Sequence, residues 1–519
     1  MSTELFARKA SGLSRSISSW DATIYNIMWM APLGTWIYSA WACSLFPGVD
    51  LAATVLICEF VAVFVGLFYA LFSAAMPRSG GDYIWMSRSL SPTIGFASNF
   101  FFLWFECSVG GALMWWVTQW SLAPMFDVFG MTDIGNWLAS NNGTFIVGVI
   151  LFIVFGILIT RGAKATHIFL WAAFILSMIS WLIYNGTLLS LGREGWIASF
   201  NALSGMNYDE VIKAGSQVGY PSSYVLSATL LGSVFTYFSF TGYNCSVYYA
   251  AEIKNVRKSQ FVAILGSSVA FMIILWIHMF VTQQVIGQPF YGSLAYLWGT
   301  GEAAYGLPFP PFFQFLFRYA TDNKVLYALV AIGFAAQGAA GPLTYMFAGT
   351  RMIFSWAFDR VVPMSLAKVD SKYSSPYMAI ILMTVISVFC MALWAYTPLL
   401  SFFLYGSFGW MVMQFFASIA GIIFPWKRKD IFDTAPEIVR KKVGGVPVIS
   451  LLGVASLIGS LYIGYASVAP AYMGTFNPGY LGFTITIFIA GAIIYLVSSA
   501  YRRRSGLPLE LTFKEIPPE

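Results

Sequence analysis

Long apolar stretches separated by short polar segments run along almost the whole chain. Each stretch holds roughly 20 residues, the length that an α-helix needs to cross a bilayer. Twelve such segments can be recognised, over residues 18–46, 51–75, 95–125, 144–160, 166–190, 223–251, 260–287, 325–355, 377–396, 398–425, 447–470 and 479–500. The pattern predicts an all-α polytopic membrane protein with twelve transmembrane helices.

Composition supports this reading. Hydrophobic residues make up 58% of the chain and charged residues only 10%, with a mean hydropathy of +0.73. A soluble globular domain has roughly 25% charged residues. The longest loops, 193–222 and 289–324, are rich in Gly, Pro and aromatic residues, and no separate soluble domain fits between the spans.

The basic residues predict the orientation, because short cytoplasmic loops retain Lys and Arg. With twelve spans, 24 of the 28 basic residues fall on one side, and only Arg193, Lys213, Arg318 and Lys324 fall on the other. We therefore expect a multi-pass protein of the plasma membrane with both termini in the cytoplasm. The net charge of +6 follows from this topology and indicates no nucleic-acid partner.

Two spans carry helix breakers near their middle: Pro32-Leu33-Gly34-Thr35 in the first and Phe240-Thr241-Gly242-Tyr243 in the sixth. A break at that depth survives only where it faces protein or a watery cavity. Breaks at corresponding positions in two halves are typical of secondary transporters built from inverted repeats. The chain then divides into a cytoplasmic arm (1–17), a first repeat (18–190), a second repeat (223–425), two further helices (447–500) and a cytoplasmic tail (501–519).

Three predicted cytoplasmic junctions carry distinctive motifs. They are Met76-Pro77-Arg78-Ser79-Gly80-Gly81-Asp82 after span two, Ala251-Glu252-Ile253-Lys254-Asn255 after span six, and Gly349-Thr350-Arg351 with Asp359-Arg360 at the end of span eight. In this order and topology they resemble the amino acid-polyamine-organocation (APC) permease superfamily. The resemblance implies a LeuT-like fold of two inverted five-helix repeats plus two helices. It also implies a substrate held between the unwound parts of spans one and six and lined by spans three and eight.

The breaks suggest how an amino acid would bind. N–H groups at the start of a half-helix attract a carboxylate, and freed carbonyls suit an ammonium group. We assign the backbone of Leu33, Gly34 and Thr35 to the carboxylate and that of Phe240, Thr241 and Gly242 to the amine. The resemblance implies an aromatic gate at Phe238. Trp36 is a second gate candidate, and Tyr243 is counted as part of the wall.

Glu106 lies deep in span three, where an ionisable group is by default a functional candidate. By alignment it faces the pocket, and Cys107 beside it is counted as substrate-binding. Glu106 is a candidate for binding a cationic substrate group or for carrying a coupling proton, and a carboxyl used only in helix packing is the alternative. Glu59 in span two is interpreted as structural.

The chain departs from the family at several points. Pro32 and Leu33 replace an expected glycine and serine, which puts carboxylate recognition in doubt. Ser177 and Asn244 stand where some relatives have a coupling lysine and an acid-sensing glutamate.

Other classes of function fit the sequence less well. Only two histidines are present and buried carboxylates are sparse, which argues against a membrane-embedded enzyme. A channel should show rings of polar filter residues, and the sequence shows none. We predict a secondary transporter of amino acids, with a polyamine or other organic amine as the alternative substrate. No cofactor or metal is predicted, and a proton, a sodium ion or exchange stay open as coupling modes.

Overall fold

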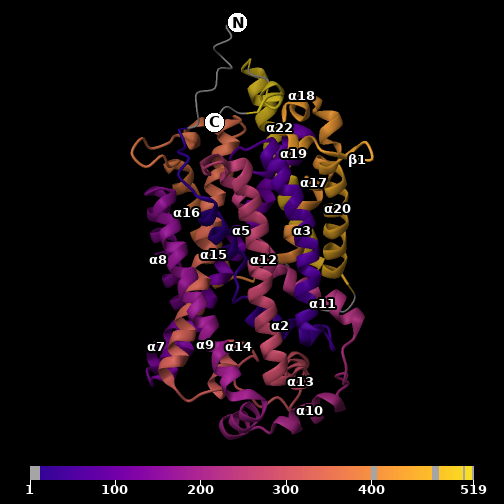
Figure 1. Cartoon of the computed structure of the whole chain (residues 1–519). Coiled ribbons are helices and arrows are strands. Elements are labelled where there is room, and N and C mark those ends of the chain that lie inside the picture. Colours follow the sequence, from indigo (N-terminus) through magenta and orange to yellow (C-terminus); the bar gives the residue numbers. More distant parts are fainter. Residues whose placement is uncertain (1–11, 399–405, 470–477, 507–508, 517–519) are drawn as a thin grey trace.

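The computed structural model describes residues 12–398, 406–469, 478–506 and 509–516 as a bundle of long helices (Figure 1). Within these residues, ten helical segments are long and apolar enough to cross a membrane. They are built on α3 (Leu51–Ala75), α5 (Pro92–Val117), α8 (Asn141–Thr160), α9 (Ala163–Ser204), α12 (Val256–Thr282), α15 (Lys324–Phe358), α16 (Tyr377–Tyr396), α17 (Gly406–Lys427), α20 (Val448–Ser467) and α22 (Pro478–Arg504). This arrangement agrees with the predicted polytopic membrane protein.

The two other predicted spans are each in two pieces. Residues 18–46 form α1 (Ser19–Met30) and α2 (Thr35–Leu45), and residues 223–251 form α11 (Leu226–Phe240) and the 3-10 helix η3 (Cys245–Glu252). Each piece is shorter than the 18 residues required of a spanning helix, so none is counted among the ten. The interruptions fall at the segments where the sequence predicted helix breaks.

Side-chain caps explain where several helices start. Ser18 and Asp21 form a reciprocal capping box at the start of α1. The Asp50 carboxylate accepts from the first N–H groups of α3, and the Asn323 side chain does the same for α15. Sequence signals of this kind set the helix boundaries locally.

Short elements cover the two ends of the bundle. One end carries α4 (Asp82–Ser89), η6 (Met364–Ala367), α18 (Lys429–Thr434), α19 (Glu437–Arg440), α23 (Leu509–Thr512) and an antiparallel hairpin of β1 (Lys442–Val443) and β2 (Val446–Pro447). The other end carries α7 (Thr132–Ala139), α10 (Tyr208–Gln217), α14 (Phe313–Leu316) and η5 (Phe317–Tyr319). Figure 1 separates α18 and α19 from α7 and α10 in this way. We call the first the basic end, because Arg88, Arg351 and Arg428 gather there.

Two spans continue through π-helical turns. α5 leads through η2 (Thr118–Leu122) into α6 (Ala123–Val128), and α12 leads through η4 (Gln283–Gly287) into α13 (Gln288–Thr300).

The segment 193–222, expected as a long loop, is largely helical. α9 continues through Gly192, which takes a φ of 62°, and ends only at Ser204. The Asn207 side chain then caps α10 by accepting from the N–H groups of Asp209 and Glu210. A loop was predicted here because the segment is rich in Gly and Pro. The Asn cap and the acidic first turn, which are standard signals of a helix start, were given too little weight.

Candidate functional site

The first break leaves backbone donors at the start of α2. α1 stops where Ala31 takes a left-handed conformation, with φ 57° and ψ 80°, and Pro32 has no N–H to continue the helix. The Gly34 N–H turns back to the Ala31 carbonyl at 2.8 Å. The N–H groups of Leu33 and Thr35 have no backbone acceptor among the described residues. Two of the three predicted donors are therefore available, and that of Gly34 is not.

The second break leaves backbone acceptors. Gly242 takes a φ of 119°, a region that side-chain-bearing residues rarely adopt. Its carbonyl receives the Cys245 N–H at 3.0 Å, which starts η3. The carbonyls of Phe240 and Thr241 receive no N–H donor among the described residues. The end of α11 thus presents two free carbonyl oxygens.

The last turn of α1, just before the first break, touches the second break through Trp29 and Gly242. A Cβ built on Gly242 would lie 2.6 Å from Trp29 Cγ, well inside van der Waals contact. The close approach and the positive φ both require glycine at this position.

Asn26 fastens α1 to the second break. Its amide nitrogen donates to the Tyr243 carbonyl at 2.6 Å, and its side-chain oxygen accepts from the Ser246 N–H at 2.9 Å. Gln260 of α12 supports the same point, because it accepts from the Ser246 hydroxyl at 2.7 Å. The sequence analysis missed Asn26, although a polar amide in an apolar span is itself a signal of interhelical hydrogen bonding.

α15 supports α1 from the other side. The Gln337 amide donates to the Met28 carbonyl at 3.1 Å, and the Tyr25 hydroxyl donates to the Thr344 carbonyl at 2.7 Å. Both contacts hold the last turns of α1 before its break.

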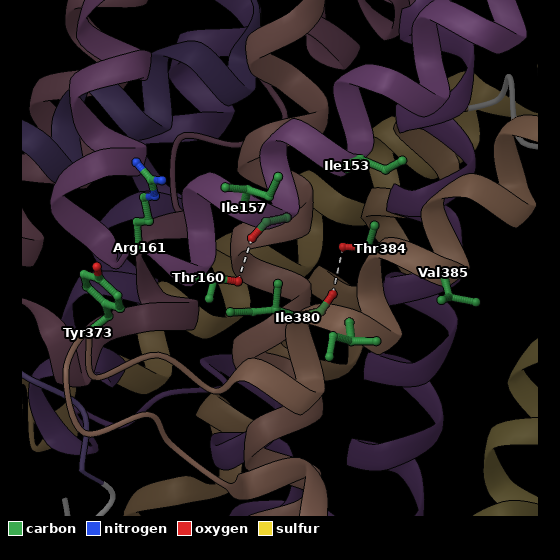
Figure 2. Close-up of a pocket in the computed structure, with 10 residues that line it drawn as sticks. Ile153, Ile157, Thr160, Arg161, Tyr373, Ile380, Thr384 and Val385 are labelled. Atoms are coloured by element: carbon green, nitrogen blue, oxygen red, sulfur yellow. Dashed lines mark hydrogen bonds between the residues drawn. The ribbon is translucent and has the colours of Figure 1, made fainter.

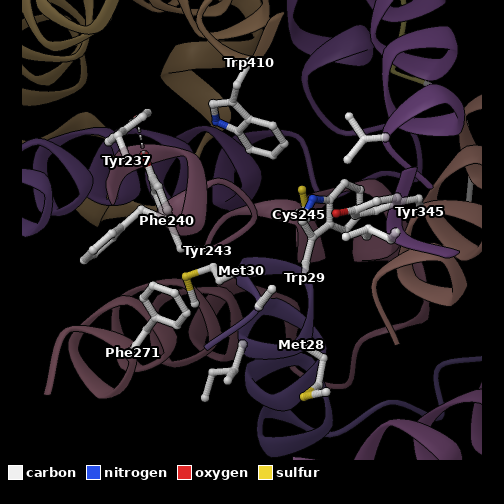
Figure 3. Close-up of a cluster of buried hydrophobic side chains, with 14 of the residues drawn as sticks. Met28, Trp29, Met30, Tyr237, Phe240, Tyr243, Cys245, Phe271, Tyr345 and Trp410 are labelled. Atoms are coloured by element: carbon white, nitrogen blue, oxygen red, sulfur yellow. Dashed lines mark hydrogen bonds between the residues drawn. The ribbon is translucent and has the colours of Figure 1, made fainter. Parts of the chain in front are cut away.

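A box of aromatic rings surrounds Trp29. Its ring centroid lies 4.8 Å from Tyr345, 6.1 Å from Trp410, 6.4 Å from Tyr248 and 6.5 Å from Phe102. Figure 3 shows Trp29, Tyr345 and Trp410 converging on the break. Because 18% of all residues are aromatic, sequence alone could not single these out.

Glu106 and Cys107 face different neighbours. Glu106 is 4% exposed and has no hydrogen bond among the described residues. It is close enough to Cys245 of η3 and Tyr345 of α15 to interact with them electrostatically, which places it toward the second break. Cys107 instead has its Sγ 3.9 Å from the Met383 sulfur of α16. Its contact is therefore with a packing helix.

Phe238 lines a cavity next to the first break. This cavity has a volume of about 160 Å³, and Tyr38 and Trp116 also line it. The rings of Phe238 and Tyr38 lie 5.0 Å apart. A Cβ on Gly34 would lie 3.1 Å from Trp116 and 3.2 Å from Tyr38, so the first break adjoins these walls.

Three other predicted site residues direct their side chains into helix packing. Trp36 packs on Tyr184 of α9 at 4.7 Å, and Phe240 packs on Phe271 of α12 at 5.0 Å. The Tyr243 hydroxyl accepts from an amide of α17 at 3.3 Å. At Phe240 the break leaves the backbone carbonyl free, whereas the Tyr243 carbonyl is bound by Asn26.

The segments that carry the three junction motifs meet at the basic end. The Arg88 guanidinium donates to both Asp359 oxygens at 2.7 and 2.8 Å, and Arg351 donates to both Glu252 oxygens at 2.7 and 3.0 Å. All four side chains are at most 3% exposed. The backbone of Ile17 pairs with the residues at and just after Glu252. Buried ion pairs therefore join α4, α15 and η3 at this end of the molecule.

A further cavity, of about 430 Å³, lies between α8 and α16 (Figure 2). Its lining is mostly aliphatic, and the hydroxyls of Thr160 and Thr384 donate to carbonyls of their own helices at 2.8 and 2.9 Å. It lies apart from both breaks and offers a polar solute few partners.

Comparison with known families agrees with these features. A family model of amino acid permeases matches residues 17–498, which include both breaks and all three junction motifs. The predicted resemblance to the APC superfamily is thereby confirmed. The chain belongs to the amino acid permease family, whose members transport amino acids or related organic compounds across membranes.

Proposed function

We propose that this permease carries α-amino acids across the plasma membrane by alternating access, with the solute held between the two helix breaks. The unpaired N–H groups of Leu33 and Thr35 fit a carboxylate. The unpaired carbonyls of Phe240 and Thr241 fit an ammonium group. The observation that carries the proposal is this opposite polarity of free backbone groups at the two breaks, which the contact between Trp29 of α1 and Gly242 brings near each other.

We propose a twelve-helix architecture with two inverted repeats of five helices. The broken α1/α2 and α11/η3 then occupy corresponding positions in the repeats, as inverted-repeat transporters require. α20 and α22 follow as additional helices. The excess of Lys and Arg supports a cytoplasmic location for the basic end and for both termini.

Alternating access explains the asymmetry of the two ends. In the present state the cytoplasmic end is closed by the buried pairs Arg88–Asp359 and Arg351–Glu252. The cavity beside Phe238 and Gly34 lies on the other side of the break. Release of the solute to the cytoplasm then requires both ion pairs to separate.

Competition between derivatives of one amino acid tests the proposal. The best ligand is first found by a thermal-shift screen, since a ligand that binds only the folded state stabilises it. In proteoliposomes we expect neither its amide, which lacks the carboxylate, nor its N-acetyl form, which lacks the ammonium, to compete for uptake. Equal competition by the amide would contradict carboxylate recognition at Leu33 and Thr35.

An organic amine is the second candidate, favoured by Glu106 and the aromatic box. A buried carboxyl without a hydrogen-bond partner and rings that attract cations both suit an amine. Putrescine should then compete better than any amino acid. Glu106→Gln separates the roles of this residue: loss of preference for cations indicates binding, loss of pH dependence indicates proton coupling, and no change indicates packing.

A further inference from the structure

A second pocket opens at the basic end, away from the helix breaks. It has a volume of about 460 Å³ and lies between the start of α1, the start of α9 and the segment after η3. Lys164 and His167 of α9, Asp21 of α1 and Lys254 are among its lining residues.

The charged side chains of this pocket that are free to bind a ligand are two lysines, so the charge that it offers to a ligand is positive. Lys164 and Lys254 are exposed, and neither ammonium group has an ion-pair partner in the described part of the chain. α9 begins at Ala163 without a side-chain cap, and Gly162 is its N-cap residue. The unsatisfied N–H groups of this 42-residue helix therefore add the positive end of its dipole.

A buried histidine supplies a second, independent feature. His167 is 4% exposed and lines the pocket. Its Nδ1 lies 2.7 Å from the Ala163 carbonyl and so carries a proton. In the neutral ring Nε2 is then an acceptor, and it is buried without a partner among the described residues. Buried polar atoms are normally satisfied by protein or ordered water, so this nitrogen suits a hydroxyl donor of a bound ligand.

The one acidic residue in the pocket is already bound. Asp21 Oδ2 accepts from the Ser18 N–H at 3.1 Å and hydroxyl at 2.7 Å, and Oδ1 accepts from Trp171 Nε1 at 3.0 Å. These bonds hold the carboxylate in the capping box of α1.

The pocket adjoins the surface that faces the bilayer. Along α9, apolar residues recur every seven positions with high exposure: Ile168 (61%), Ile175 (52%), Leu182 (60%) and Leu189 (62%). Residues at this spacing share one helix face. Ile168 also lines the pocket. A ligand whose charged part binds there can therefore lay its apolar part along this face of α9.

We propose that this pocket binds the headgroup of an anionic phospholipid of the cytoplasmic leaflet, with the phosphate at Lys164, Lys254 and the start of α9, a headgroup hydroxyl donating to His167 Nε2, and the acyl chains along the Ile168 face of α9. Basic pockets between helices on the cytoplasmic side are suited to such headgroups. The assignment rests on the proposed orientation but does not depend on which solute is carried.

The lipid would also contact three segments that meet at the basic end: the start of α9, the residues after η3 and the residues before α1. Ser16 and Ile17 line the pocket, and Ile17 pairs through its backbone with Glu252 and Lys254 at 3.0 and 2.9 Å. A ligand that contacts α9, Lys254 and this segment together stabilises the arrangement in which they meet.

The test compares wild type, Lys164→Gln/Lys254→Gln and the control Lys441→Gln/Lys442→Gln, which removes the same charge from exposed residues at the same end. Each purified protein is titrated with phosphatidylglycerol, phosphatidylcholine or inorganic phosphate. Thermal stability and native mass spectrometry report binding, and solute uptake is measured separately. With roughly 1 kcal/mol per lysine, we expect the pocket variant to bind phosphatidylglycerol about 30-fold more weakly.

Selective stabilisation by phosphatidylglycerol in wild type and control, but not in the pocket variant, supports the proposal. Equal stabilisation of all three proteins, or of none, overturns it. Inorganic phosphate as effective as the lipid overturns the lipid assignment. Because uptake is read independently, none of these results bears on the amino acid site.

Discussion

Gly242 occupies a position where the fold leaves no space for a side chain. Gly242→Ala should lower the thermal stability and abolish uptake, because alanine at φ 119° is strained and its Cβ would lie 2.6 Å from Trp29 Cγ. Left-handed strain alone costs about 1–2 kcal/mol. Melting in detergent and uptake in proteoliposomes measure the effect.

Gly266→Ala is the matched control, because, apart from its chain neighbours and the backbone of its own helix, nothing lies within 4 Å of the added Cβ. It should melt and transport like wild type. Normal uptake by Gly242→Ala would show that the contact between the two breaks is dispensable.

Asp82 lies in the connection between α3 and α5. Its titration should make the stability of the folded protein depend on pH. Burial raises the pKa of Asp82 to about 7, although hydrogen bonds from Tyr248 and Tyr69 oppose the shift. The unfolded chain releases this proton near 3.8. Between these values the folded protein binds more protons, so its stability falls as pH rises.

Asp82→Asn removes the titrating carboxyl group and keeps a side chain of nearly the same size and shape. The melting temperature of wild type relative to Asp82→Asn should therefore decrease as pH rises from about 4 to about 7 and level off above. A difference that stays constant over this range would contradict protonation of Asp82 in the folded state.

Individual site residues could be predicted from the sequence only where the residue type itself determines the backbone conformation. Pro32 and Gly242 break helices for reasons visible in the sequence. Ala31, by contrast, is an ordinary helix former, and only its surroundings hold it at φ 57°. Trp29 likewise became a site residue only when the fold placed it on Gly242.

Among the elements, the two ion pairs of the basic end should control its opening. Glu252→Gln leaves the Arg351 charge buried without a counter-charge, which typically costs about 3–5 kcal/mol. We expect this variant to open more often at the basic end. A maleimide added from that side should then label Cys245, now 1% exposed, faster than in wild type, as read by mass spectrometry.

Asp430→Asn provides the control, because Asp430 pairs with Arg428 while its side chain is 64% exposed. An exposed pair contributes at most about 1 kcal/mol, so labelling of Cys245 should not change. Equal labelling of wild type and Glu252→Gln would show that this pair does not hold the end closed.

The predicted helix ends match the structure where the capping residues and the hydropathy indicate the same boundary. They differ from the structure where these two signals disagree. α3 occupies the predicted range 51–75. The expected loop at 193–222 contains α10 because its capping Asn207 outweighs the glycines around it. Pairing between motifs was not predictable, since Arg88 and Asp359 are 271 residues apart and many carboxylates could have been the partner.

At the scale of the whole molecule, hydropathy predicted a polytopic helical membrane protein, and the described residues agree with this class. Apolar length identified ten long helices, and mid-span Pro and Gly marked the two further predicted spans that are interrupted. Sequence could not supply the contacts that join the halves, such as Asn26 with Tyr243, because they depend on how distant helices pack. Those contacts decide which free backbone groups come together.

The most direct measurement is an experimental structure of the permease with its tightest-binding amino acid. We expect the carboxylate within about 3 Å of the Leu33 and Thr35 nitrogens, and the ammonium at the Phe240 and Thr241 carbonyls. A bound amino acid located away from both breaks, with these four groups satisfied by protein alone, would contradict the proposed site.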